Sequence, residues 1–165
     1  MSSNAPPSIQ IRPPATPDEW DAAREIFREY GQSIRAALDS AAFDDEVAGL
    51  PGEYDEPRGG LVLAWIDGSL AGCCALRPLD AADYPNASEM KRLYVRRVFR
   101  GFGLGRQLTE AALDVARQCG YACVLLDTLD AMDAARALYA DLGFEEIPPY
   151  YDSPLAGAHY LKADI

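Results

Sequence analysis

With 165 residues, a formal net charge of −11 and 49% hydrophobic residues, the chain has the size and composition of one globular domain. Its acidity argues against nucleic acid as a partner, because binding to a phosphate backbone needs a broad basic face. No apolar run is long enough to cross a membrane, and the Ser/Asn/Pro-rich start lacks the pattern of an export signal. We therefore expect a single domain over residues 1–165, soluble and cytoplasmic, with residues 1–8 as a flexible N-terminus.

The cysteines and the single histidine argue against a metal or redox site. Cys73 and Cys74 are adjacent, and Cys119 and Cys123 have neither the spacing of a disulfide framework nor that of a Cys-x-x-Cys pair. His159 has no neighbouring cluster of ligand-type residues. We expect buried free thiols, a structural histidine and no metal.

The first third of the chain predicts a short strand followed by helices. Residues 9–12 alternate like a strand, and the segment 16–19 places threonine at an N-cap, proline at the first helical position and glutamate in a capping box. Apolar residues then recur at helical spacing, namely Trp20, Ala23, Phe27, Tyr30 and Ile34. We expect a second helical piece over 36–42. Prolines and glycines over 43–60 indicate a loop, or a short helix plus a loop.

The middle of the chain predicts a hairpin and a further strand. Residues 61–66 and 70–76 are strand-like runs joined by Asp67-Gly68, a strong signal for a two-residue hairpin turn. After a loop at 78–86, residues 87–95 are expected to form the next strand.

Two strand and helix units follow, and two strands close the chain. A helical stripe over 104–119 ends at Gly120, and a second over 131–142 ends at Gly143. The expected strands are 122–127, 145–147 and 158–165. The whole order predicts a mixed α/β (α+β) fold with a mostly antiparallel central sheet of six to seven strands, flanked by helices.

A glycine-rich turn lies between the strand at 87–95 and the helix at 104–119. It reads Arg100-Gly101-Phe102-Gly103-Leu104-Gly105-Arg106. Glycines let main-chain N–H groups approach an anion closely, and a helix that follows adds unpaired donors and the positive end of its dipole. The surrounding stretch from 90 to 109 contains six lysines and arginines and no acidic residue: Lys91, Arg92, Arg96, Arg97, Arg100 and Arg106. We expect this turn to bind a polyanionic small molecule.

The chain resembles the GNAT superfamily of N-acetyltransferases. The acetyl-CoA motif of that family, Q/R-x-x-G-x-G/A, is matched by Arg100, Gly103 and Gly105, and Val95 matches the residue that ends the preceding strand. A later family element is matched by Ala135, Tyr139, Gly143 and Phe144. The resemblance covers residues 87–144 well and implies the acyl-CoA N-acyltransferase fold.

The resemblance also implies how acetyl-CoA, as co-substrate, is held. The backbone from Gly101 through Phe102, Gly103, Leu104 and Gly105 to Arg106 is expected to bind the pyrophosphate, with Arg100 at its edge. The main chain of Leu93, Tyr94 and Val95 is expected to pair with the pantetheine arm like an added strand, and Ala135 to line the cofactor. One of Arg96, Arg97 and Arg106 is a candidate for the 3′-phosphate, although surface arginines that serve only solubility are an equal alternative.

Two residues are candidates for catalysis. An amine with a pKa of about 10.4 is neutral in only about one molecule in a thousand near pH 7, so a base is useful. Glu89 lies where some family members place a glutamate base, and in a regular strand it shares a face with Leu93 and Val95; the alternative is a glutamate paired with a neighbouring cation. Tyr139 matches the family tyrosine that protonates the departing thiolate. The alternative is that Tyr139 only packs in the core. Many relatives have asparagine at the position of Met132, so any CoA contact made through that amide is lost or replaced here.

In this fold the acceptor enters between residues 43–56 and 148–157. Six carboxylates make the first segment acidic, namely Asp44, Asp45, Glu46, Glu53, Asp55 and Glu56. They are expected either to attract a cationic amine or to form a solvated loop. Tyr150, Tyr151 and His159 are candidates for the edge of the pocket.

Three functions fit the sequence. The first is an N-acetyltransferase that transfers the acetyl group from acetyl-CoA to a primary amine of a small molecule or peptide, by direct attack in a ternary complex. The second is a non-catalytic regulatory domain that binds CoA or acyl-CoA, and the third is a nucleotide-binding protein. A monomer or homodimer fits equally well, and the acceptor and the length of the acyl group are left open.

Overall fold

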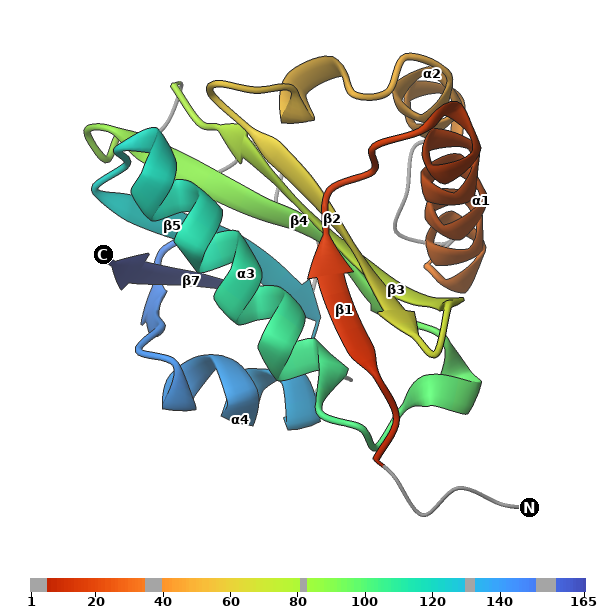
Figure 1. Ribbon diagram of the computed structural model, residues 1–165. Coiled ribbons are helices and arrows are strands. Elements are labelled where there is room, and N and C mark those ends of the chain that lie inside the picture. The colour runs from red at the N-terminus through yellow and green to blue at the C-terminus, as the bar shows by residue number, and fades with distance from the viewer. Residues whose placement is uncertain (1–5, 35–39, 81–82, 130–132, 151–156) are drawn as a thin grey trace.

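The computed structural model describes residues 6–34, 40–80, 83–129, 133–150 and 157–165, and it is built on one seven-stranded sheet (Figure 1). The strands lie in the order β1-β2-β3-β4-β5-β7-β6. The helices and 3-10 turns are α1 (Pro17–Ser33), α2 (Ser40–Ala48), η2 (Gly52–Tyr54), η3 (Arg97–Phe99), α3 (Leu104–Cys119) and α4 (Asp133–Asp141). The strands are β1 (Ile9–Arg12), β2 (Gly60–Ile66), β3 (Ser69–Pro78), β4 (Ala87–Val95), β5 (Cys123–Leu129), β6 (Glu145–Ile147) and β7 (Ala158–Asp164).

The predicted fold class is confirmed. Only the β4–β5 pair is parallel, and every other recorded pair is antiparallel. Helices α3 and α4 pack on one face of the sheet, and α1 and α2 pack on the other (Figure 1). None of the described helices is long and apolar enough to cross a membrane.

The predicted N-cap of α1 at Thr16 is confirmed. The Thr16 side chain accepts a hydrogen bond of 3.2 Å from the Glu19 N–H. The Glu19 carboxylate in turn accepts from the Ala15 N–H at 2.8 Å and pairs with Arg12. These contacts satisfy donors at the helix start that would otherwise be unpaired, and they fix α1 against the end of β1.

The predicted hairpin between β2 and β3 is also confirmed. Asp67 and Gly68 have φ angles of 48° and 82°, as a two-residue type I′ turn requires. Asp67 also binds the N-terminal segment: its carboxylate accepts from the Ser8 N–H, and its N–H donates to the Ser8 carbonyl. Ser8 is therefore held by the sheet, whereas residues 1–5 of the segment expected to be flexible lie outside the described residues.

The second helix extends further along the chain than the predicted range 36–42. Residues 36–39 of that range lie outside the described residues, and α2 continues to Ala48, within the segment 43–60 for which a loop, or a short helix plus a loop, was expected. Phe43 and Val47 are its buried residues, and they pack with α1 in the core. These two apolar side chains lie one helical turn apart, so burial favours the helix despite its acidic neighbours.

Candidate functional site

The glycine-rich turn connects η3 to α3, and two of its glycines have positive φ angles. Gly101 has φ 96°, and Gly103, the N-cap of α3, has φ 76°. A side chain is strained in this region of conformational space, which favours glycine at both positions. A Cβ atom added to either residue would meet nothing within 4 Å. The space above the turn is therefore open.

The N-terminus of α3 is suited to an anion. No side chain caps it, and its first turn contains no acidic residue. Its first N–H groups are consequently free to bind an anion, and the helix dipole adds a partial positive charge. The Leu104 side chain is buried, so this residue presents only its main chain to the turn. Phe102 is 45% exposed and lies beside the opening. These features fit the phosphates of CoA.

The cations near the turn divide into structural and exposed ones. Arg96 binds Glu29 and Glu25 of α1, and Arg106 pairs with Asp141. Both therefore hold other parts of the fold. The Arg100 Nε donates to the Val95 carbonyl at 3.1 Å, which fixes the turn against the end of β4. Arg97 is exposed, and no ion pair or hydrogen bond of its side chain is recorded within the described ranges.

The pairing between β4 and β5 stops next to this turn, and the region between their unpaired ends is called the slot below. The two strands pair in parallel at only three positions, from Ala87↔Cys123 to Glu89↔Leu125, although β4 continues to Val95 and β5 to Leu129. The edge of β4 beyond Glu89 thus has no partner in β5. Such an edge can accept an extended ligand through main-chain hydrogen bonds.

A bulge in β4 corrects the predicted position of Glu89. Cys73 pairs with Tyr94 and Ala75 with Lys91, so Arg92 and Leu93 both oppose the single residue Cys74. Arg92 has φ 62°. An extra residue resets the alternation of side chains. Leu93 and Val95 therefore pack on the α3 face, whereas Glu89 lies on the opposite face beside Arg77.

Tyr139 lies on α4 and is almost fully buried. Its ring packs edge-on against Phe144 with centroids 5.6 Å apart. Burial raises the pKa of its phenol, with smaller contributions from Cys74, Tyr30 and Asp127. The hydroxyl is therefore protonated at neutral pH and able to donate a proton. Ala135, one turn earlier on α4, packs against the same core cluster.

Glu89 is completely buried, and both its carboxylate oxygens accept hydrogen bonds. Arg77 donates from Nε at 2.8 Å and binds the same oxygen, Oε1, through its terminal nitrogen at 2.7 Å. The Tyr150 hydroxyl donates to Oε2 at 2.8 Å. The Lys91 Nζ lies 3.9 Å from Oε1. This environment stabilises the charged carboxylate.

Asp127 is a second carboxylate at the slot, and the sequence analysis did not select it. It lies on β5, two residues beyond the last pair with β4, and its side chain is open to solvent. Partial desolvation by neighbouring protein atoms raises the pKa of Asp127. The Lys91 charge opposes this shift, and the Glu89 charge adds to it. Burial lowers the pKa of Lys91. The sequence signal that could have selected Asp127 is its place as a polar residue near the end of an apolar strand.

The expected acidic entrance is partly neutralised by arginines. The Glu46 carboxylate accepts two hydrogen bonds of 2.9 Å from Arg92, whose guanidinium also lies over the rings of Tyr30 and Phe43. Glu53 pairs with Arg77 at 2.6 Å. These carboxylates connect α2 and η2 to the sheet.

Other expected site residues have different positions. His159 lies 2.8 Å from Glu146 on the neighbouring strand, which agrees with a structural role. Met132 and Tyr151 lie outside the described residues. Within the described ranges, no group of three or more His, Cys, Asp or Glu residues is arranged to hold a metal ion.

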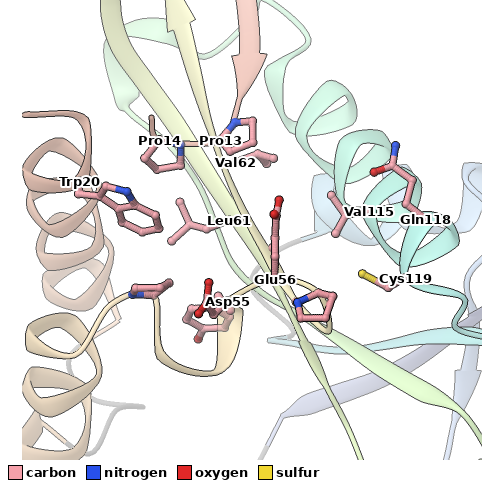
Figure 2. Close-up of a pocket in the computed structure, with 15 residues that line it drawn as sticks. Pro13, Pro14, Trp20, Asp55, Glu56, Leu61, Val62, Val115, Gln118 and Cys119 are labelled. Carbon is pink, nitrogen blue, oxygen red and sulfur yellow. The ribbon is translucent and has the colours of Figure 1, made fainter. Parts of the chain in front are cut away.

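A cavity of about 470 Å³ lies away from both the turn and the slot (Figure 2). It is bounded by the start of α1, the segment before β2 and the C-terminal end of α3, where Trp20, Leu61 and Val115 are wall residues. Since α3 has 16 residues, its far end is about 24 Å from the glycine turn. This cavity is thus separate from the slot.

Comparisons with known proteins identify the family of this chain. The model of the acetyltransferase (GNAT) family matches residues 20–144. An uncharacterised N-acetyltransferase of Schizosaccharomyces pombe is 33% identical over 161 residues, which cover 97% of each chain. Human N-acetylaspartate synthetase is 34% identical over 115 residues, which are 69% of this chain and 37% of that protein.

The fold also matches solved structures. The PaiA N-acetyltransferase of Thermoplasma acidophilum, solved in complex with coenzyme A, superposes with a TM-score of 0.68 over 96% of this chain and 99% of that one. The two sequences are 16% identical, so this likeness concerns the fold.

Proposed function

The chain belongs to the acetyltransferase (GNAT) family, and from this we propose that it transfers the acetyl group of acetyl-CoA to a primary amine of a small molecule or peptide, within a ternary complex. The observation that carries the proposal is the uncapped glycine turn beside a slot that exposes one edge of β4. Acetyl-CoA, when bound, supplies an activated acetyl thioester. The chain's own residues hold it, exclude water and move protons.

Main-chain groups are proposed to do most of the binding. The N–H groups from Gly101 to Arg106 would bind the pyrophosphate, and the open space beside Gly101 and Gly103 supports this assignment. Arg97 is the best candidate for a further phosphate, because Arg96 and Arg106 are engaged in ion pairs. The unpaired edge at Leu93–Val95 fits the pantetheine arm as an added strand.

Tyr139 is proposed as the proton donor to the departing thiolate. Its raised pKa keeps the hydroxyl protonated, and its position on α4 is electrostatically coupled to Asp127 and Tyr30 across the slot. A group that remains protonated at neutral pH suits a general acid.

The base is proposed to be a carboxylate on the acceptor side, and two candidates differ in their environment. Glu89 accepts hydrogen bonds at both oxygens, so direct removal of a proton requires it to release Tyr150. Asp127 is open to solvent and has a raised pKa, so its ionised carboxylate accepts a proton more readily than that of an ordinary aspartate. We favour Asp127 as the base and Glu89 as an anchor for Arg77 and Tyr150.

The acceptor class is proposed from the charges at the entrance. Arg77, Lys91 and Arg92 lie near Glu46, Glu53 and Glu89, so both signs of charge are present. An amino acid or a short peptide offers both an amine and a carboxylate. The similarity to N-acetylaspartate synthetase supports the inclusion of aspartate among the first acceptors tested.

Two measurements test the proposal. Native mass spectrometry of the purified protein with added acetyl-CoA should detect a one-to-one complex, which would separate a CoA-binding protein from a nucleotide-binding one. Thiol release should then be followed with amino acids, polyamines, aminoglycosides and peptides as acceptors. Acetyl-CoA binding with no thiol release from any acceptor would favour the regulatory alternative, and absence of binding would contradict both.

A further inference from the structure

The cavity in Figure 2 has the size of a small-molecule site and has no role in the proposed reaction. Its volume of about 470 Å³ lies within the range of pockets that hold small ligands, roughly 300–1,000 Å³. The length of α3 separates it from the phosphate-binding turn. Any ligand here would therefore bind in addition to acetyl-CoA.

Apolar and aromatic side chains form most of its walls. The indole of Trp20 lies on the α1 side, Leu61 and Val62 come from β2, and Val115 lies on the α3 side (Figure 2). Trp20 is only partly buried, so one surface of its ring remains available. This lining suits the apolar body of a ligand, and an indole face also attracts a cation.

Two carboxylates give the cavity its charge. Asp55 and Glu56 line it, and no lysine, arginine or histidine does. Neither side chain has a recorded ion pair or hydrogen bond within the described ranges, in contrast to Glu46 and Glu53, which bind arginines. Arg58 is close in sequence but pairs with Asp80 at 2.7 Å.

The Glu56 side chain lines the cavity and is also exposed to solvent. Figure 2 shows its side chain extending between Leu61 and Val115. Burial and the Glu56 charge together raise the pKa of the Cys119 thiol on the opposite wall. A cationic ligand in the cavity would be attracted by this negative charge.

We propose that this cavity binds a primary alkylammonium ion with an apolar body. The ammonium group would donate charge-assisted hydrogen bonds to Asp55 and Glu56, while the apolar body would pack against Trp20, Leu61 and Val62. The proposal is independent of acetyl transfer, because it concerns binding at a separate cavity.

The probe is phenethylammonium, compared with its neutral analogue 2-phenylethanol. Trp20 is the natural reporter, and Trp65→Phe removes the other tryptophan. Since the Trp65 indole N–H has no hydrogen-bond partner in the structure, this change leaves no carbonyl or carboxylate unsatisfied. We expect saturable change of Trp20 fluorescence with phenethylammonium and none with 2-phenylethanol. Calorimetry on the unmodified protein provides the same comparison without that substitution.

The double variant Asp55→Asn/Glu56→Gln keeps the shape of the cavity and removes its charge. Loss of charge-assisted hydrogen bonds should weaken phenethylammonium binding by at least about tenfold. Asp114→Asn is the matched control, because it removes a carboxylate from an exposed ion pair on α3 outside the cavity lining. We expect its affinity to match that of the unmodified protein. Equal binding of 2-phenylethanol, unchanged affinity in the double variant or no saturable binding would each overturn the proposal.

Discussion

Replacement of Gly103 by valine tests the phosphate-binding turn, and the same helix provides its control. Gly103 caps the start of α3 with φ 76° and ψ 17°, and Gly120 caps its end with φ 85° and ψ 18°. A Cβ at either glycine would meet no neighbouring atom within 4 Å. The two substitutions therefore impose the same kind of backbone strain, and neither creates a clash at Cβ.

The strain sets the expected loss of stability. A left-handed conformation costs an L-residue about 1–2 kcal/mol. For a domain of this size, about 1 kcal/mol corresponds to about 2–4 °C in Tm, so each variant should melt about 2–8 °C lower. Only Gly103→Val places a side chain in the open space above the turn. We expect its affinity for CoA to fall by at least about tenfold, or about 1.4 kcal/mol, and that of Gly120→Val to be unchanged.

Thermal melting and calorimetric titration with CoA measure the two effects separately. If Gly103→Val bound CoA as tightly as the unmodified protein, the assignment of the phosphate site would be wrong. If both variants lost affinity equally, the loss would reflect general destabilisation and the reasoning from the open space would fail.

Three further predictions concern catalysis and thiol reactivity. Tyr139→Phe should lower kcat at least about tenfold with little change in the KM for acetyl-CoA, because it removes a proton donor while it preserves the ring packing. As a base, Asp127 acts when deprotonated, so activity should rise as the pH increases through its raised pKa. Asp127→Asn should remove this rise, which is the acid limb of the pH profile. Glu89→Gln should keep the acid limb but destabilise the fold. Burial raises the pKa of Cys74 to about 12, so a thiol reagent should modify Cys119, the one cysteine that is not buried, before the other three.

Each of these expectations has a clear contrary result. Full turnover in Tyr139→Phe would remove its proposed role as the acid. An acid limb retained in Asp127→Asn and lost in a folded Glu89→Gln would return the base role to Glu89. Modification of all four cysteines at equal rates in the native protein would contradict the described burial.

Local sequence signals predicted most elements of the fold. The Thr16 cap, the Asp67-Gly68 turn and the glycine at each end of α3 act through the backbone of their own neighbourhood. Such signals can be read without knowledge of distant contacts. The glycine-rich turn was predicted for the same reason.

The details of the site were less predictable, because they depend on distant partners. The bulge at Arg92 arises where β4 meets β3, and one additional residue reversed the expected face of Glu89. Arg77, which binds Glu89, had no distinguishing motif in the sequence. Asp127 belongs to the site because β4 and β5 diverge just before it, and no local sequence pattern predicts that divergence.

The short parallel contact between β4 and β5 means that an extended ligand bound along β4 would become part of the sheet itself. A cofactor that completes this edge would slow amide hydrogen exchange in β4 as a neighbouring strand does, and it would add about 2.7 kcal/mol of apparent stability at a hundredfold excess over its Kd. Without it, unpaired strand edges remain at the centre of the sheet, where another chain can pair with them. Cofactor supply would then govern how long the protein resists aggregation.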